Sequence, residues 1–528
     1  MSKDSENKAV KSKVIDADMI GSLIKDGATV ATGGIVGSSF PECLTAALER
    51  YFLAHHSPRG ITLYYAAGQG DGKTRGSDHF AHEGMTTRVI GGHWGMAPKL
   101  GKMAVDGVIE GYNLPQGVLV HLYRDIAAHR PAHLTTVGLG TFVDPRFGGG
   151  KIGARTTRDL VSLTEIDGQE CLLYKTLPID VALIRGTTAD TNGNITCERE
   201  AVALEELSIA MAARNSGGIV IVEVERLTNS GTMNPTHVRI PAGLVDYVVV
   251  AKPEEHMQTF AEAYNPAYCG EVKMPLSVIP AMEMSERKII ARRAAMELAP
   301  GYMVNLGFGM PEGVGAIAAE ENIFNLMTLT TEPGVIGGIP ASGLSFGAAI
   351  NPEAIIDQPY QFDFYDGGGL DITILGLAQA DKEGNLNVSR FGPKLAGCGG
   401  FINICQATKK VVFIGTFTAG GLDVRIENGR LVIAKEGRTP KFIAEVEQRT
   451  FSGPLASRSG RSVLYITERC VFRLTEGALE LTEIAPGVDV EKDILAHMAF
   501  KPRIAADLKT MDARIFRPEP MGLRRNMI

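Results

Sequence analysis

Short apolar runs rich in β-branched residues alternate along the chain with longer stretches in which apolar side chains recur at helical spacing. The first pattern is typical of buried strands, and the second is typical of helices that cover a sheet. The pattern predicts strands at 28–32, 60–66, 87–90, 107–110, 370–375, 401–405 and 410–416. It predicts helices at 16–25, 43–52, 114–128, 286–298 and from about 490 onward. This alternation indicates an α/β fold with mostly parallel sheets and helices on both faces.

Two distant parts of the chain repeat the same pattern. Residues 25–42 run from a helix end through an apolar strand and a glycine loop to Pro-Glu, and residues 299–312 do the same. The stretch that begins at Asp180 also matches the stretch that begins at Asp371, with Asp, Gly and Asn at the same later positions. Two matches in the same order indicate an internal duplication. We therefore expect two duplicated open α/β domains, over residues 1–275 and 276–528.

The composition narrows the classes of function. Of the 528 residues, 45% are hydrophobic and 21% are charged, and a net charge of −7 gives no reason to expect a nucleic-acid or membrane partner. No apolar run approaches the roughly 20 residues that span a bilayer, and the first residues resemble neither a signal peptide nor a transit peptide. The seven cysteines are scattered without a CxxC motif, which favours reduced thiols. A cytoplasmic location is expected.

A carboxylate stands at the end of one apolar run, in the segment 328–334, which reads Thr-Leu-Thr-Thr-Glu-Pro-Gly. Proline and glycine force a turn directly after the predicted strand. In an open α/β sheet, ligands bind at the carboxyl ends of the strands. Glu332 is therefore placed to face a ligand. An ordinary surface glutamate at the start of a loop is the alternative that this segment alone leaves open.

Four motifs with known chemistry are present only in part. The segment 67–74 ends like a phosphate-binding loop but lacks its first glycine and the helix that should follow. The segment 307–313 has GxGxxxG spacing and a proline where a dinucleotide needs backbone N–H groups. His79 and His82 lack a third metal ligand nearby, so no metal site is expected. Ser345 lies in Gly-x-Ser-x-Gly without the flanking strand and helix of a nucleophile elbow.

The segment around Glu332, the glycine loops and the duplication together resemble the family I coenzyme A transferases over nearly the whole chain. The resemblance implies two subunit types fused in one polypeptide. The carboxy-half signature of the family usually reads Ser-Glu-Asn-Gly, whereas residues 331–334 read Thr-Glu-Pro-Gly. With proline in place of asparagine, this segment resembles that of the single-chain propionate or acetate CoA-transferases, one branch of the family. The amino-half signature is only approximated by residues 26–41, where Ile35 replaces a phenylalanine.

The resemblance also implies roles for individual residues. It implies that Glu332 is the nucleophile, which becomes a glutamyl-CoA thioester, and that the N–H of Gly400 helps to form an oxyanion hole. It implies substrate contacts for Gln116, in Pro-Gln-Gly, and for Asn305, in Asn-Leu-Gly-Phe-Gly-Met-Pro. The residues expected to lie against CoA are Gly307, Phe308, Gly309 and Gly399. Coenzyme A is then both substrate and covalent intermediate, with no tightly bound cofactor, small carboxylic acids as partners and a homo-oligomeric assembly.

The implied chemistry exchanges one carboxylate for another and one thioester for another, so it requires no ATP. A glutamate with its ordinary pKa of about 4.3 is ionised at neutral pH, so Glu332 is expected to attack without a general base. Two other functions stay open at this point. One is an acyl-CoA hydrolase on the same scaffold, with water in place of the acceptor acid. The other is a non-catalytic sensor of CoA or a sugar phosphate.

Overall fold

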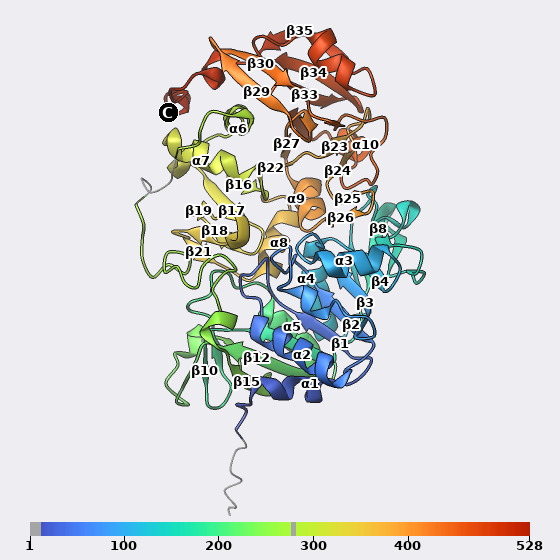
Figure 1. Cartoon of the computed structure of the whole chain (residues 1–528), viewed down its shortest axis with the longest axis vertical. Helices are drawn as coiled ribbons and strands as arrows, with labels where there is room; N and C mark the ends of the chain where they lie inside the picture. The colour runs from blue at the N-terminus through green and yellow to red at the C-terminus, as the bar shows by residue number, and fades with distance from the viewer. Residues whose placement is uncertain (1–11, 276–280, 528) are drawn as a thin grey trace, which may run out of the picture.

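Two large sheets, one from each half of the chain, form the centres of two stacked lobes (Figure 1). The computed structural model describes residues 12–275 and 281–527. The first sheet has the order β15-β12-β9-β1-β2-β3-β4-β6 and is parallel except where β6 pairs with β4. Its strands are β1 (Thr29–Thr32), β2 (Ile61–Tyr65), β3 (Thr86–Gly91), β4 (Glu110–Asn113), β6 (Lys151–Ile152), β9 (Val181–Arg185), β12 (Ile219–Val224) and β15 (Tyr247–Val250).

The second sheet is longer and mixed in direction, with the order β21-β18-β17-β16-β22-β27-β32-β33-β34-β35. The five strands from β17 to β32 are parallel, and the antiparallel strands β18 and β33 adjoin them on either side. The strands are β16 (Met303–Leu306), β17 (Thr328–Thr331), β18 (Val335–Ile336), β21 (Ala354–Ile355), β22 (Ile372–Gly376), β27 (Lys410–Ile414), β32 (Ser462–Ile466), β33 (Cys470–Thr475), β34 (Ala478–Ile484) and β35 (Arg503–Thr510).

The predicted duplication is visible in the order and the hydrogen bonds of both sheets. The order β2-β1-β9-β12-β15 in the first sheet corresponds to β17-β16-β22-β27-β32 in the second, and every pair within both sets is parallel. The Asp180 carboxylate accepts a hydrogen bond from the N–H of Thr29 at 2.8 Å, and Asp371 accepts one from Met303 at 2.9 Å. The halves are therefore two copies of one α/β arrangement, as the sequence predicted.

The strand register matches individual positions of the two halves. Val30 pairs with Leu63 and Val181, and Val304 pairs with Leu329 and Ile372. Counting along the strands from these pairs shows that Ala66 of the first half corresponds to Glu332 of the second. In the same way, Arg185 corresponds to Gly376. The position that holds a carboxylate in one half thus holds a methyl group in the other, and an arginine in one half corresponds to a glycine in the other.

Helices α2 (Glu42–His55), α4 (Gln116–Ala127) and α6 (Glu286–Ala295) lie where the periodicity predicts them. The predicted strand at 401–405 is wrong, because these residues form helix α9 (Phe401–Ala407). Its first five residues are all buried, and a short apolar run buried on every side does not distinguish strand from helix.

The predicted terminal helix is also wrong. The chain after residue 489 makes only two short helical turns, Val490–Ile494 and Leu495–His497, before strand β35. Strand β4 begins at Glu110, where the strand predicted at 107–110 was expected to end. The predicted domain boundary at 275/276 lies beside residues 276–280, which are outside the described residues, and it remains a prediction.

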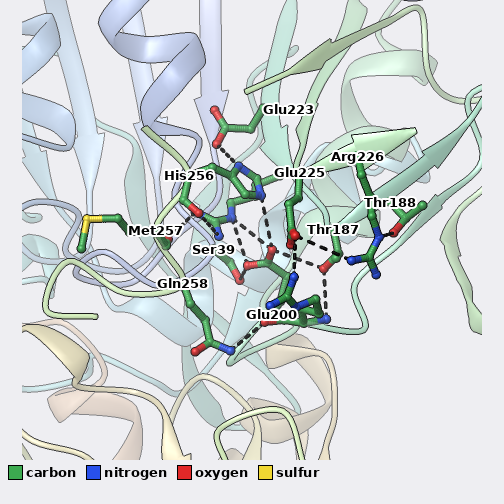
Figure 2. Close-up of polar contacts among 12 residues, drawn as sticks. Ser39, Thr187, Thr188, Glu200, Glu223, Glu225, Arg226, His256, Met257 and Gln258 are labelled. Carbon is green, nitrogen blue, oxygen red and sulfur yellow. Dashed lines mark hydrogen bonds and ion pairs between the residues drawn. The ribbon is translucent and has the colours of Figure 1, made fainter. Parts of the chain in front are cut away.

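A buried polar network lies at the carboxyl edge of the first sheet (Figure 2). Arg185, the last residue of β9, forms an ion pair with Glu200 and donates a hydrogen bond to the carbonyl of Met257 at 2.7 Å. His256 Nδ1 lies 2.9 Å from a carboxylate oxygen of Glu223 on β12. This network fastens the segment that follows β15 to the ends of β9 and β12.

All seven cysteines are free, in agreement with the expectation of unpaired thiols. Among the described residues, no helix combines the length and the apolar character that crossing a bilayer requires.

Candidate active site

A cavity of about 210 Å³ lies where the two lobes meet, and residues at the carboxyl ends of β16, β17 and β22 line it. Helices α4 and α9, together with α8 (Gln358–Asp366), come together at this junction (Figure 1). The amino-terminal half contributes Ile35, Val36, Gly68, His93, Met96 and Gln116 to the wall. The other half contributes the loop after β16, the residue after β17, the end of β22 and the segment 397–401. Neither half alone forms the site.

Glu332 follows β17 directly and lies in a tight hairpin turn. The N–H of Gly334 donates to the carbonyl of Thr331 at 3.2 Å, and β18 then returns antiparallel to β17. Gly334 has a φ of +107°, and a Cβ at this position would overlap the carbonyl oxygen of Ile356. Only glycine fits there. The strand and the turn that the sequence predicts are both present. The turn leaves the side chain of Glu332 in the wall of the cavity.

The surroundings of Glu332 change its acid strength. Burial raises the pKa of its carboxyl to about 7, and the nearby Gln116 amide opposes this rise only in part. No arginine or lysine is among the residues that line the cavity in the described part of the chain, so no cation there stabilises the ionised form. The expectation of an ordinary pKa is therefore wrong, because the sequence does not show that the strand end is enclosed.

Gly400 and Gln116 lie beside Glu332. A Cβ on Gly400 would lie 2.6 Å from an oxygen of Glu332, so the carboxylate rests directly against the glycine backbone. Gln116 is the first residue of α4 and is 1% exposed. Its amide nitrogen makes no hydrogen bond of normal geometry to any of the described residues. Two neutral groups with donor N–H bonds thus border the reactive carboxylate.

Backbone hydrogen bonds between the halves fix the segment that carries Gly400. The N–H of Gly399 donates to Gly92 at 2.8 Å, and the N–H of Gln116 donates to Gly399 at 3.0 Å. The side chain of Asn113, at the end of β4, accepts from the N–H of Cys398 at 3.0 Å and donates to the carbonyl of Gly92. These contacts set the position of Gly400 relative to Gln116, although the two residues come from different halves.

Two of the residues expected in the site do not line the cavity. Asn305 is 1% exposed, and its side-chain amide oxygen accepts a hydrogen bond from the hydroxyl of Thr373 at 3.1 Å. It belongs to a buried network with Tyr365, whose hydroxyl lies 2.7 Å from that of Thr330 on β17. Gly309 binds the carboxylate of Glu312 through its N–H at 3.0 Å. Asn305 therefore supports the strand that carries the catalytic candidate from behind the wall.

The loop after β16 forms the rim of the cavity. Gly307 and Phe308 both line it, and Phe308 is 54% exposed, which is unusual for a large apolar side chain. Its ring meets that of Phe346 edge to face, with 5.0 Å between the centroids. An exposed aromatic ring that packs on a buried one at the mouth of a cavity can cover the uncharged part of a long ligand.

Sequence reasoning missed His93, Met96, Val36 and Phe346 as cavity residues. His93 had a detectable signal, because it follows the predicted strand at 87–90 and a Gly-Gly pair, as Glu332 follows its own strand. The other three are apolar residues in loops, and nothing in their local pattern distinguishes a cavity wall from an ordinary core.

The partial motifs have structural roles. His79 lies 2.9 Å from Glu42 and 2.6 Å from Glu49, and His82 lies 2.6 Å from Glu49, so both histidines join a loop to helix α2. The described residues contain no group of three or more side chains that could hold a metal ion. The hydroxyl of Ser345 lies 2.9 Å from that of Thr259 and has no histidine partner among the described residues.

Comparison with known proteins identifies the family. Residues 15–251 match the family model described as coenzyme A transferase. The chain is 48% identical to the caffeate CoA-transferase of Acetobacterium woodii, covering 97% of this chain and 98% of that one. It is 42% identical to the acetate CoA-transferase YdiF of Escherichia coli K12, covering 96% of both.

The structure agrees with this comparison. It superimposes with a TM-score of 0.91 on the acyl-CoA transferase YdiF of Escherichia coli O157:H7, which was solved as a thioester complex with CoA. The two chains are 41% identical, and the match covers 97% of each. The chain therefore belongs to the coenzyme A transferase family and is a single-chain CoA-transferase.

Proposed function

We propose that this enzyme moves CoA between acyl-CoA thioesters and small monocarboxylic acids through a covalent glutamyl-CoA thioester on Glu332. The observation that carries the proposal is the position of this carboxylate. It lies in the cavity between the halves, against Gly400 and close to the amide of Gln116, whose nitrogen makes no geometrically defined hydrogen bond within the described part of the chain. The thioester complex formed by the related YdiF protein supports an intermediate of this kind.

The proposed reaction has two symmetrical stages. A carboxylate oxygen of Glu332 attacks the thioester carbonyl, the carbon–sulfur bond breaks, and an anhydride and the CoA thiolate result. The thiolate then attacks the Glu332 carbonyl, the donor acid leaves as its carboxylate, and Glu332 remains as the CoA thioester. The acceptor carboxylate reverses the sequence. Every bond that breaks is replaced by one of the same type, so no tightly bound cofactor is proposed.

Neutral donors stabilise the charge that develops in each attack. The N–H of Gly400 and the amide of Gln116 can donate to the carbonyl oxygen as it becomes negative, and one such donor is worth roughly 10²–10³ in rate. Phe308 and the glycines around it are proposed to cover the CoA chain at the rim. Binding energy from this distant part of CoA can then stabilise the transition state.

The cavity favours acids with one charge. Its side chains are mainly apolar, with Val36, Met96, Phe346 and Leu375 among them, and it has no lysine or arginine in its described lining to pair with a second carboxylate. Acetate and propionate fit this description. The similarity to a caffeate CoA-transferase makes an aromatic monocarboxylate the second candidate. Succinate, with two charges, is expected to be a poor acceptor.

We also propose a cytoplasmic homo-oligomer. The free thiols are consistent with a reducing compartment. Light scattering after size-exclusion chromatography measures the number of chains directly, and a monomer at micromolar concentration would contradict the proposed assembly.

Mass spectrometry tests the intermediate. The protein is mixed with excess acetyl-CoA, its intact mass is measured, and the modified peptide is mapped. The expected result is an added CoA moiety on the Glu332 peptide that hydroxylamine removes. Glu332→Gln should form no adduct, whereas Glu353→Gln, which alters an exposed carboxylate near the same hairpin, should load fully. An adduct on another residue, or none with acetyl-, propionyl- or caffeoyl-CoA, would contradict the proposal.

The same adduct separates transfer from hydrolysis. Its decay is followed in buffer and then with increasing acetate. Discharge that depends on acetate and yields acetyl-CoA identifies a transferase, whereas equally fast decay in buffer with release of free CoA would favour the hydrolase.

A further inference from the structure

His93 is a titratable side chain in the cavity wall to which the proposed mechanism gives no role. It follows β3 and the Gly91-Gly92 pair, and it lines the same cavity as Glu332. Within the described residues, neither of its ring nitrogens has a hydrogen-bond partner, whereas histidines 79, 82 and 256 each lie within hydrogen-bond distance of a carboxylate. An imidazole without a partner in an enclosed site has its hydrogen-bonding capacity available for a ligand.

Three glycines approach the imidazole closely. A Cβ on Gly68 would lie 2.5 Å from Nδ1, one on Gly95 would lie 3.0 Å from Cε1, and one on Gly399 would lie 3.7 Å from Cδ2. These contacts cover three edges of the ring, and none of the nearest ones falls on Nε2. Nε2 is therefore the ring nitrogen that these glycines leave open.

The same glycines place His93 next to the proposed oxyanion donors. A Cβ on Gly399 would lie 3.6 Å from the amide oxygen of Gln116 and 3.7 Å from the Cβ of His93, so the two side chains flank this residue. The next residue, Gly400, touches Glu332. Glu332, Gln116 and His93 thus border one short glycine segment and line the same cavity.

The charge state of His93 fits a neutral donor. Burial lowers its pKa to about 4, so the imidazole is uncharged at neutral pH. An incoming acid must keep its negative charge to attack the thioester, and pairing with a full cation would reduce its reactivity. A neutral N–H replaces part of the water that the carboxylate loses on entry without cancelling its charge.

We propose that Nε2 of His93 donates a hydrogen bond to the carboxylate of the acceptor acid and positions it for attack on the thioester at Glu332. This proposal rests on the proposed function and adds a residue that recognises the acid rather than CoA. It requires the tautomer with hydrogen on Nε2, in which Nδ1 packs against Gly68.

Kinetics of the two half-reactions test the proposal. His93→Leu removes the donor, His93→Gln keeps an N–H group, and His55→Leu makes the same change at an exposed histidine at the end of α2, outside the cavity. For His93→Leu, the acetate concentration that gives half-maximal discharge of the CoA adduct should rise about tenfold to a hundredfold, the range for a hydrogen bond to a charged group. His93→Gln should recover part of this loss, and His55→Leu should stay within about twofold of the wild type.

A purely structural role for His93 predicts a different result. In that case the half-maximal acetyl-CoA and acetate concentrations rise together, or only the melting temperature falls, and either outcome overturns the proposal. Loading with acetyl-CoA distinguishes failure of this proposal from failure of the proposed function. If the wild type forms the Glu332 adduct and His93→Leu discharges at normal acetate concentrations, only the role of His93 is wrong.

A measurement without turnover gives a second test. In Glu332→Gln, the ring protons of His93 are assigned by comparison with the His93→Leu double variant and followed by NMR during titration with acetate. Saturable shifts of these signals are expected. No shift at acetate concentrations that saturate wild-type turnover would contradict the proposal.

Discussion

The carboxyl edges of the two central sheets hold carboxylates in opposite surroundings. At the first edge, Arg185 and Glu200 form an ion pair with 3.0 Å between Nε and the carboxylate oxygen, and their side chains are 3% and 4% exposed. At the second edge, Glu332 faces a cavity without a lysine or arginine in its described lining, and burial raises its pKa to about 7. The first carboxylate holds the chain together, whereas the second is available for reaction.

The register of the strands shows how one fold supports both arrangements. Arg185 of the first sheet corresponds to Gly376 of the second, and Gly376 lines the cavity. Glu332 corresponds to Ala66. The second half therefore has a carboxylate where the first has a methyl group, and empty space where the first has an arginine. The absence of an arginine at position 376 thus leaves Glu332 without a cationic partner in the described lining of the cavity.

The largest expected effect comes from giving the second edge the cation of the first. Gly376→Arg should reduce kcat/KM at least about a thousandfold, because the guanidinium fills the cavity and pairs with the nucleophile. A Cβ at this position meets nothing within 4 Å, so Gly376→Ala should retain most of the activity. Initial rates of CoA transfer from acetyl-CoA to propionate measure both. Equal losses in the two variants would show that the backbone of Gly376, rather than the absence of charge, is what matters.

Removing the cation from the first edge should affect stability and leave the chemistry intact. Arg185→Met leaves Glu200 buried without its partner, and breaking a buried pair in this way costs about 3–5 kcal/mol. Urea denaturation followed by circular dichroism measures the loss. Under conditions in which Arg185→Met is folded, the acetyl-CoA concentration that gives its half-maximal rate should be close to that of the wild type. Exposed Arg473→Met, which breaks a surface pair with Glu480, should cost less than about 1 kcal/mol. Equal losses in the two variants would contradict the contrast.

The smallest effect is the pH dependence of the reactive edge. The ionised form of Glu332 is the nucleophile, so kcat/KM should fall about tenfold for each unit below pH 7 and level off above it. In the cavity, burial lowers the pKa of His93 to about 4 and raises that of Cys398, so neither accounts for a change near pH 7. A rate that stays constant down to pH 5 would mean that the carboxyl keeps its ordinary acidity.

The folding stability should change with pH in the direction opposite to the activity. A carboxyl whose pKa is raised on folding contributes stability that is fully present below the unfolded pKa and is lost as the pH rises through about 7. The glutamine in Glu332→Gln does not titrate. The melting temperature of this variant, relative to that of the wild type, should therefore rise between pH 5 and pH 8. No such gain would indicate that Glu332 is better solvated than its position in the cavity implies.

The sequence by itself determined the arrangement of the chain and much of the chemistry. Apolar runs of strand length, helices between them and the repeated Asp-Gly-Asn pattern were sufficient to predict two copies of a parallel α/β unit. The Thr-Glu-Pro-Gly segment placed Glu332 at the end of a strand, because proline and glycine leave the backbone no regular continuation. These are local properties, which the order of residues encodes directly.

Only the tertiary structure decided what surrounds that carboxylate. The pKa of Glu332 depends on how the two halves enclose it, and Gly400, Gln116 and His93 come to the same cavity from segments far apart in the chain. Asn305 has the expected sequence context and yet lies behind the cavity wall, because the alternation of side chains along β16 directs it into the buried network with Tyr365. The buried run at 401–405 belongs to a helix, which its own short apolar pattern did not distinguish from a strand.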